Sequence, residues 1–92
     1  MDEMRFLRIA LQNNLKVQVL YSYNLKKIQK SLAVRFVYAL KGRDKNIGIV
    51  EEFGGEFIAS ACFFIPFIRD KEMQEIMKQW GIHPIRKILL TC

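Results

Sequence analysis

The side chains best suited to bind a ligand are the basic residues between positions 24 and 45. This segment holds seven lysines and arginines but one acid, Asp44, so its net charge is +6. The seven are Lys26, Lys27, Lys30, Arg35, Lys41, Arg43 and Lys45. Clustered positive charge attracts nucleic acid, because contact with phosphate releases condensed counterions. The segment therefore predicts a surface that binds DNA or RNA.

Two tyrosines near the basic residues supply a second means of contact. Tyr23 and Tyr38 lie in segments that the sequence pattern predicts to be adjacent strands, and aromatic rings stack on unpaired bases. In the competing interpretation, the lysines only keep the protein soluble and the tyrosines fill the core. No RNP, KH or helix-turn-helix signature separates these two interpretations.

Residues that usually perform catalysis are few and far apart in this chain. The single histidine, His83, stands next to Pro84 after a predicted helix, where a surface or capping role is expected. Cys62 lies in an apolar run that disfavours a reactive thiolate, and Cys92 is remote from it. One histidine and two distant cysteines cannot form a structural zinc site. The sequence therefore predicts neither an enzyme nor a bound cofactor.

Three glutamates surround a pair of glycines, Gly54-Gly55. The glutamates are Glu51, Glu52 and Glu56. Carboxylates can hold Mg²⁺, but beside a turn they are usually solvated and need no metal. The glycines lack the lysine and the following helix of a phosphate-binding loop. We expect a turn at the glycines and no metal site around them.

The composition indicates one small globular domain, residues 1–92, with 51% hydrophobic and 26% charged residues. This is too apolar for a disordered chain and too charged for a membrane protein. The longest uncharged apolar run, residues 57–68, is shorter than the roughly 20 residues that span a bilayer. Charges interrupt residues 1–11, so no secretory signal is predicted and a cytoplasmic location is expected.

The start of the chain predicts two helices and a strand. Residues 2–13 fit either a helix or a strand, and the helix separates polar from apolar side chains better. Residues 15–23 alternate between apolar and polar side chains, which predicts a half-buried strand. Asn24 is a favourable N-cap for a short basic helix over residues 25–32.

The middle of the chain predicts three further strands. Residues 33–40 are rich in β-branched and aromatic side chains, which favours a strand, and residues 41–46 form a polar turn. Residues 47–53 and 57–65 then flank Gly54-Gly55, which predicts a β-hairpin because glycine readily adopts positive φ. The second arm is apolar on both faces, so we expect a central strand covered on both sides.

The end of the chain predicts a helix and a closing strand. Pro66 is expected to end the preceding strand. Asp70 is expected to cap a helix over residues 71–80, which ends at Gly81. The apolar residues of this helix follow a spacing of three to four positions. They are Met73, Ile76, Met77 and Trp80. Residues 85–90 are expected to form the last strand.

The predicted elements place the protein in the α+β class. We expect a small mixed or antiparallel sheet of about four to five strands with two or three helices packed on it. The leading hypothesis is a non-enzymatic accessory domain that binds nucleic acid through its basic segment without strong sequence preference. The alternative is a protein-interaction subunit or inhibitor that docks on an acidic protein, or a homodimer formed through surplus apolar surface. No membrane association is expected.

Overall fold

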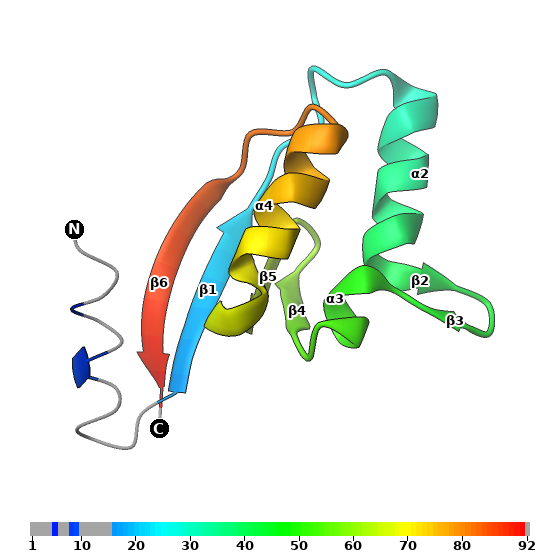
Figure 1. Ribbon diagram of the computed structural model, residues 1–92. Coiled ribbons are helices and arrows are strands. Elements are labelled where there is room, and N and C mark those ends of the chain that lie inside the picture. Colours follow the sequence, from blue (N-terminus) through cyan, green and yellow to red (C-terminus); the bar gives the residue numbers. More distant parts are fainter. Residues whose placement is uncertain (1–4, 6–7, 10–15, 92) are drawn as a thin grey trace.

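The computed structural model describes residues 5, 8–9 and 16–91, and its centre is an antiparallel sheet (Figure 1). Four strands form this sheet in the order β4-β5-β1-β6. Their bounds are β1 Lys16–Ser22, β4 Glu56–Ala59, β5 Cys62–Pro66 and β6 Ile85–Thr91. The alternation that predicted a strand over residues 15–23 is confirmed, as is the predicted closing strand.

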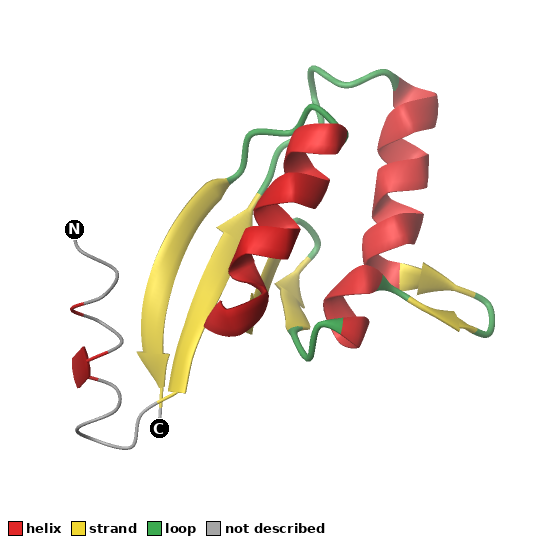
Figure 2. Ribbon diagram, viewed as in Figure 1, coloured by secondary structure: helices red, strands yellow, loops and turns green. Residues whose placement is uncertain are grey.

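Helices pack on one face of the sheet, with α4 in front of the strands and α2 beside it (Figure 2). The helices are α2 Lys30–Lys41, α3 Ile49–Glu52 and α4 Asp70–Gln79, and a 3-10 turn, η1 Phe67–Arg69, precedes α4. A small hairpin of β2 Gly42–Arg43 and β3 Asn46–Ile47 follows α2. The predicted α+β class, with a small antiparallel sheet and helices packed on it, is confirmed. Among the described helices, none has the length and apolar character needed to cross a membrane.

The chain follows a βαββαβ path through β1, α2, β4, β5, α4 and β6, with the hairpin and α3 inserted after α2. With this strand order, the path is the split βαβ, or ferredoxin-like, arrangement. One face of the sheet lies under the helices, and the described helices leave the other face uncovered. Because this topology hosts many unrelated functions, it assigns none by itself.

The core lies between the sheet and the helices. Tyr21 of β1 is fully buried, and its ring stacks on that of Phe63, its partner in β5, at a centroid distance of 5.3 Å. From α2, Phe36 reaches the same layer, where its ring meets those of Tyr23 at 5.3 Å and Trp80 at 5.6 Å. One aromatic cluster therefore joins β1, β5, α2 and the end of α4.

The predictions of a helix over residues 25–32 and a strand over residues 33–40 are wrong. Residues 25–29 form a turn, and α2 occupies Lys30–Lys41. The helix buries Phe36 and Leu40 and partly buries Ala33 and Val37, which are three to four residues apart. The β-branched residues of this segment favoured a strand. The side chains that pack against the core are spaced as in a helix, and this packing outweighs the local preference.

Asn24 does not cap a helix. Its side-chain Oδ1 accepts a hydrogen bond from the backbone N–H of Lys26 at 2.9 Å. This is an Asx turn, a local geometry that asparagine favours as readily as a helix N-cap. The turn reverses the chain after β1 and leads it towards α2.

The predicted hairpin around Gly54-Gly55 is also wrong, because the first arm contains α3 rather than a strand. Gly54 has φ +83°, and its N–H donates to the Glu51 carbonyl at 3.0 Å, while Gly55 donates to the Val50 carbonyl at 2.8 Å. These two hydrogen bonds end helix α3 in the way that is usual for a glycine after a helix. Positive φ at Gly54 therefore serves the end of a helix and not a hairpin turn. The second arm divides at residues 60–61 into β4 and β5, and β5 ends at Pro66 as predicted.

Alanine at Gly55 should destabilise the protein more than alanine at Gly54. A Cβ at Gly55 would lie 2.0 Å from the backbone oxygen of Phe64, which forces β4 and β5 apart. At Gly54 the nearest atom would be the Pro66 side chain at 3.6 Å, so the cost is the positive φ, about 1–2 kcal/mol. Urea unfolding of both variants measures the difference, and equal midpoints would contradict the close approach at Gly55.

The helix predicted over residues 71–80 is confirmed as α4, with its stop at Gly81 (φ +71°). The capping role of Asp70 is wrong, because Arg69 holds the N-cap position and Asp70 begins the helix. The Asp70 side chain instead points into the core. The helix-or-strand prediction for residues 2–13 falls mostly outside the described residues.

Candidate nucleic-acid interface

The elements that carry the basic segment lie at one side of the protein (Figure 1). Residues 24–45 make up the turn after β1, α2 and the β2–β3 hairpin. Their net charge of +6 equals that of the whole chain, so the remaining residues are neutral in sum. The structure therefore gathers the entire charge excess on one turn, one helix and one hairpin.

Along α2, three predicted site residues share a face. Lys30, Tyr38 and Lys41 are spaced so that they lie on one side of a helix, roughly opposite the buried Phe36. Arg35 is also exposed, but it lies about 140° around the axis from Lys30, at 100° per residue. Four of the basic residues flank the helix. These are Lys26 and Lys27 in the preceding turn, and Arg43 and Lys45 in the hairpin, all exposed.

At the hairpin, Arg43 contacts both an aromatic ring and an acid. Its guanidinium carbon lies 4.8 Å from the centroid of the Tyr38 ring, and its Nε lies 3.9 Å from Asp44 Oδ2. The two side chains of this ion pair are 67% and 85% exposed, and pairs of this kind contribute little free energy. Arg43 can therefore exchange Asp44 for a phosphate at small cost, while Tyr38 supports its guanidinium plane.

Tyr23, the other tyrosine predicted to stack on bases, is not on this surface. It is 6% exposed, and its ring packs edge-on against Phe36. Its hydroxyl donates to the Ser60 carbonyl at 3.4 Å, and burial raises the pKa of Tyr23. The exposed aromatic ring of the predicted pair is Tyr38, at 44%.

An open cleft of about 710 Å³ lies between the end of β1 and α2, and it adds a residue that the sequence analysis had assigned no binding role, His83. Its lining comprises Ser22, Tyr23, Asn24, Leu25, Lys26, Val37, Lys41, Ser60, Ala61, His83 and Ile85. The pairing of Ser22 with Ile85 in the β1–β6 register brings the turn after β1 beside the loop before β6. Three basic side chains and no acidic side chain line this cleft.

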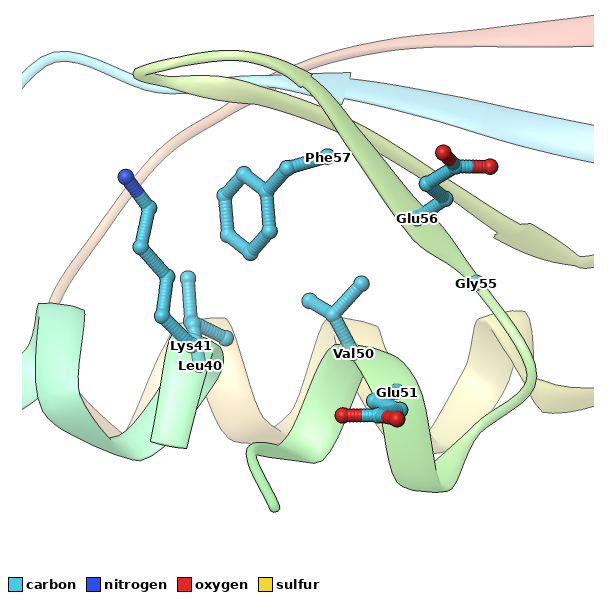
Figure 3. Close-up of a pocket in the computed structure, with 7 residues that line it drawn as sticks. All are labelled: Leu40, Lys41, Val50, Glu51, Gly55, Glu56 and Phe57. Atoms are coloured by element: carbon cyan, nitrogen blue, oxygen red, sulfur yellow. The ribbon is translucent and has the colours of Figure 1, made fainter. Parts of the chain in front are cut away.

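A second cavity, of about 310 Å³, lies between α2, α3 and β4 (Figure 3). The Phe57 ring lines it between Lys41 and Val50, and Lys41 Nζ lies 4.9 Å from the ring centroid (Figure 3). Glu51 and Glu56 also line this cavity, and their negative charges disfavour phosphate. Because Lys41 lines both cavities, it marks the border between the basic surface and the acidic one.

The described residues contain no group of three or more His, Cys, Asp or Glu side chains placed to hold a metal ion. The glutamates around Gly54-Gly55 are thus separate carboxylates. Cys62 is a free, partly buried thiol in β5.

A buried polar cluster at the start of α4 lies apart from the basic segment. Asp70, 4% exposed, accepts hydrogen bonds from Tyr21 Oη at 2.5 Å, Gln74 Nε2 at 2.7 Å and Arg86 Nε at 2.9 Å. Arg86 also forms an ion pair with the second carboxylate oxygen. Burial, with the hydrogen bond to Asp70, raises the pKa of Tyr21. The cluster ties α4 to β1 and β6, and its donors and acceptors satisfy one another.

No protein-family model, curated protein or solved structure matches this chain. The geometry and charge of the described residues therefore carry the functional argument.

Proposed function

We propose that this protein is a non-enzymatic domain that binds nucleic acid through a basic surface on the turn after β1, α2 and the β2–β3 hairpin. This surface comprises Lys26, Lys27, Lys30, Lys41, Arg43 and Lys45, with Tyr38 among them. The observation that carries the proposal is the concentration of the whole net charge in this one part of the fold. Of these basic residues, Arg43 alone forms an ion pair with a described carboxylate.

The dimensions of the surface suit several phosphates at once. With twelve residues and a rise of about 1.5 Å per residue, α2 is about 18 Å long. Phosphates of one strand are spaced about 3.4 Å along a duplex axis, so the helix spans about five of them. Lysine binds phosphate as a flexible point charge, and backbone contacts carry no sequence information. Binding without strong sequence preference follows.

Loss of two lysines from this surface should weaken binding and reduce its salt dependence. In Lys27→Gln/Lys30→Gln, the slope of log K against log salt should flatten by about 1.4 for single strands and about 1.8 for duplex, if both contact phosphate. Both residues are exposed, so thermal unfolding should be unchanged. Fluorescence anisotropy with labelled DNA and RNA, at several salt concentrations, measures the slope.

The matched control is Lys71→Gln/Lys78→Gln, which removes the same charge from exposed positions of α4. This variant should keep most of the wild-type affinity and slope. If the two variants behave alike, the total charge and not this surface governs binding. If the wild type binds neither DNA nor RNA at low salt, the proposed function is wrong.

A second candidate, self-association, is favoured by the uncovered sheet face. Ile85 and Leu89 of β6 are 67% and 37% exposed, and the register places Leu20 and Phe64 on the same face. A second copy that covers these side chains would remove apolar surface from water. Light scattering over a range of protein concentrations distinguishes the candidates, since a constant monomer mass excludes a dimer formed in this way.

A further inference from the structure

We infer that the cleft at the end of β1 receives one unpaired base of a single-stranded nucleic acid. This inference rests on the proposed function and makes it more specific. Four segments of the chain line the cleft, namely the turn after β1, helix α2, the β4–β5 turn and the loop before β6. Its volume of about 710 Å³ falls in the range of roughly 300–1,000 Å³ that is usual for ligand sites.

Apolar side chains form part of the cleft lining, and one backbone hydrogen bond fixes the position of two of them. The apolar lining residues are Tyr23, Leu25, Val37, Ala61 and Ile85. The Tyr23 N–H donates to the Ala61 carbonyl at 3.0 Å, so the end of β1 is tied to the β4–β5 turn. The Tyr23 hydroxyl donates a hydrogen bond to the carbonyl of Ser60, which is also in this turn. A flat apolar ligand therefore meets a surface that is already formed.

The remaining lining residues can recognise the polar edge of a base and its phosphate. Ser22, Asn24 and Ser60 offer hydrogen-bonding groups, and the side-chain NH₂ of Asn24 stays available because only its Oδ1 bonds Lys26. Lys26, Lys41 and His83 supply the cationic or hydrogen-bonding side, and the described lining residues of this cleft include no carboxylate. An aromatic ring with a polar edge and an attached negative charge is the chemistry of a nucleotide.

The position of the cleft favours a single strand over a duplex. Lys26 and Lys41 belong to both the basic surface and the cleft, so a strand held along α2 passes the cleft opening. In a duplex, the faces of a base are stacked and its edge is paired, so entry would require extrusion at a cost of a few kcal/mol. An unpaired base enters without that cost.

The test compares oligothymidylate of about eight nucleotides, within usual single-strand site sizes, with an abasic strand of equal length and charge. Anisotropy with wild-type protein should show about 5- to 150-fold tighter binding of the strand that carries bases. In Ala61→Phe, a ring would fill the cleft, and this preference should fall close to one while affinity for the abasic strand is kept. The control Ala59→Phe, at an exposed position of β4 outside the cleft, should keep the preference.

The possible outcomes of this test distinguish failure of the base site from failure of the proposed function. Equal wild-type affinity for both strands overturns the base site and leaves phosphate binding standing. Binding to neither strand at low salt overturns the proposed function itself. If Ala61→Phe unfolds, methyl NMR signals of Ala61 and Val37 in wild-type protein provide the second measurement. They should shift with oligothymidylate and not with the abasic strand, whereas a shift only with an aspartate-rich peptide would assign the cleft to an acidic protein and overturn the inference.

Discussion

Replacement of Arg86 by methionine should lower the free energy of unfolding by about 3–5 kcal/mol, because it leaves the buried carboxylate of Asp70 without its cationic partner. Asp70 is 4% exposed, and its side chain would retain the hydrogen bonds from Tyr21 and Gln74. Small domains are stable by only about 5–15 kcal/mol, so the loss is large. Urea unfolding followed by circular dichroism measures it.

The double variant Asp70→Leu/Arg86→Met is the informative control. Replacing both members of a buried ion pair by apolar residues is often neutral or stabilising relative to the intact pair, whereas removing one member alone is strongly destabilising. The double variant should therefore recover much of the stability that Arg86→Met loses, although Tyr21 and Gln74 would still lack their acceptor. If Arg86→Met were as stable as the wild type, Asp70 would not depend on Arg86 in solution.

The same pairing predicts how stability responds to acid. Burial opposes the charge of Asp70, but the hydrogen bonds from Arg86, Tyr21 and Gln74 outweigh it, and the pKa of Asp70 is lowered. The resulting stabilisation is complete above the unfolded-state pKa of about 3.9 and is lost as the pH falls through the folded-state value. As the pH falls below about 4, wild-type protein should therefore lose more stability than Arg86→Met, which lacks the hydrogen bond that contributes most to lowering the pKa of Asp70.

Replacement of Phe36 by alanine should cost about 3–5 kcal/mol, the usual range for removing a buried aromatic ring. Phe36 is fully buried and contacts both Tyr23 and Trp80, so it attaches α2 to β1 and α4. Because α2 carries the basic surface, the variant should also bind nucleic acid more weakly where folding is incomplete. Unfolding midpoints and anisotropy on the same samples measure both effects.

Val34→Ala, on the exposed side of α2, is the control for Phe36→Ala. Val34 is 44% exposed, and substitutions at such positions usually change stability by no more than about 0.5 kcal/mol. A large effect of Val34→Ala with a small effect of Phe36→Ala would mean that α2 is rotated relative to the structure described above.

The elements that could be predicted from sequence are those in which one pattern dominates. Residues 15–23 alternate between apolar and polar side chains except at Leu20, and β1 forms over Lys16–Ser22. Met73, Met77 and Gly81 mark the buried side and end of α4. The residues of α2 fit two patterns at once. Val34, Phe36, Tyr38 and Leu40 alternate as in a strand, while Phe36 and Leu40 also match a helix, and contacts with Tyr23 and Trp80 decide between them.

Glycine posed a similar ambiguity. Positive φ at Gly54 could be expected from sequence, but both a tight hairpin and a helix stop require it. The four-residue helix α3 is too short for a periodic pattern to reveal it. Arg86 did carry a signal. Its place between Ile85 and Lys87 in a strand sends it to the opposite face from them, and a charged residue directed inward needs a partner.

The charge of the candidate site could be predicted from sequence, but its shape could not. The basic residues are close in sequence, so their clustering survives the change from a short helix and strand to the single helix α2. Tyr23 was ambiguous, since an aromatic residue at the end of a strand can face the core or the solvent. His83 joins Lys26 only through the β1–β6 register, a long-range pairing that no local pattern encodes.

Pairing of β1 with β6 also bears on how the protein folds. The register runs from Lys16 opposite Thr91 to Ser22 opposite Ile85, so strands from opposite parts of the chain are neighbours in the sheet. Contacts between residues so distant in sequence raise the contact order, and folding rates fall as contact order rises. Until β6 docks, β1 has one open edge, and partly folded chains expose a strand that can pair with another molecule. Fluorescent labels at positions 16 and 91 would come together only when this long-range pairing has formed.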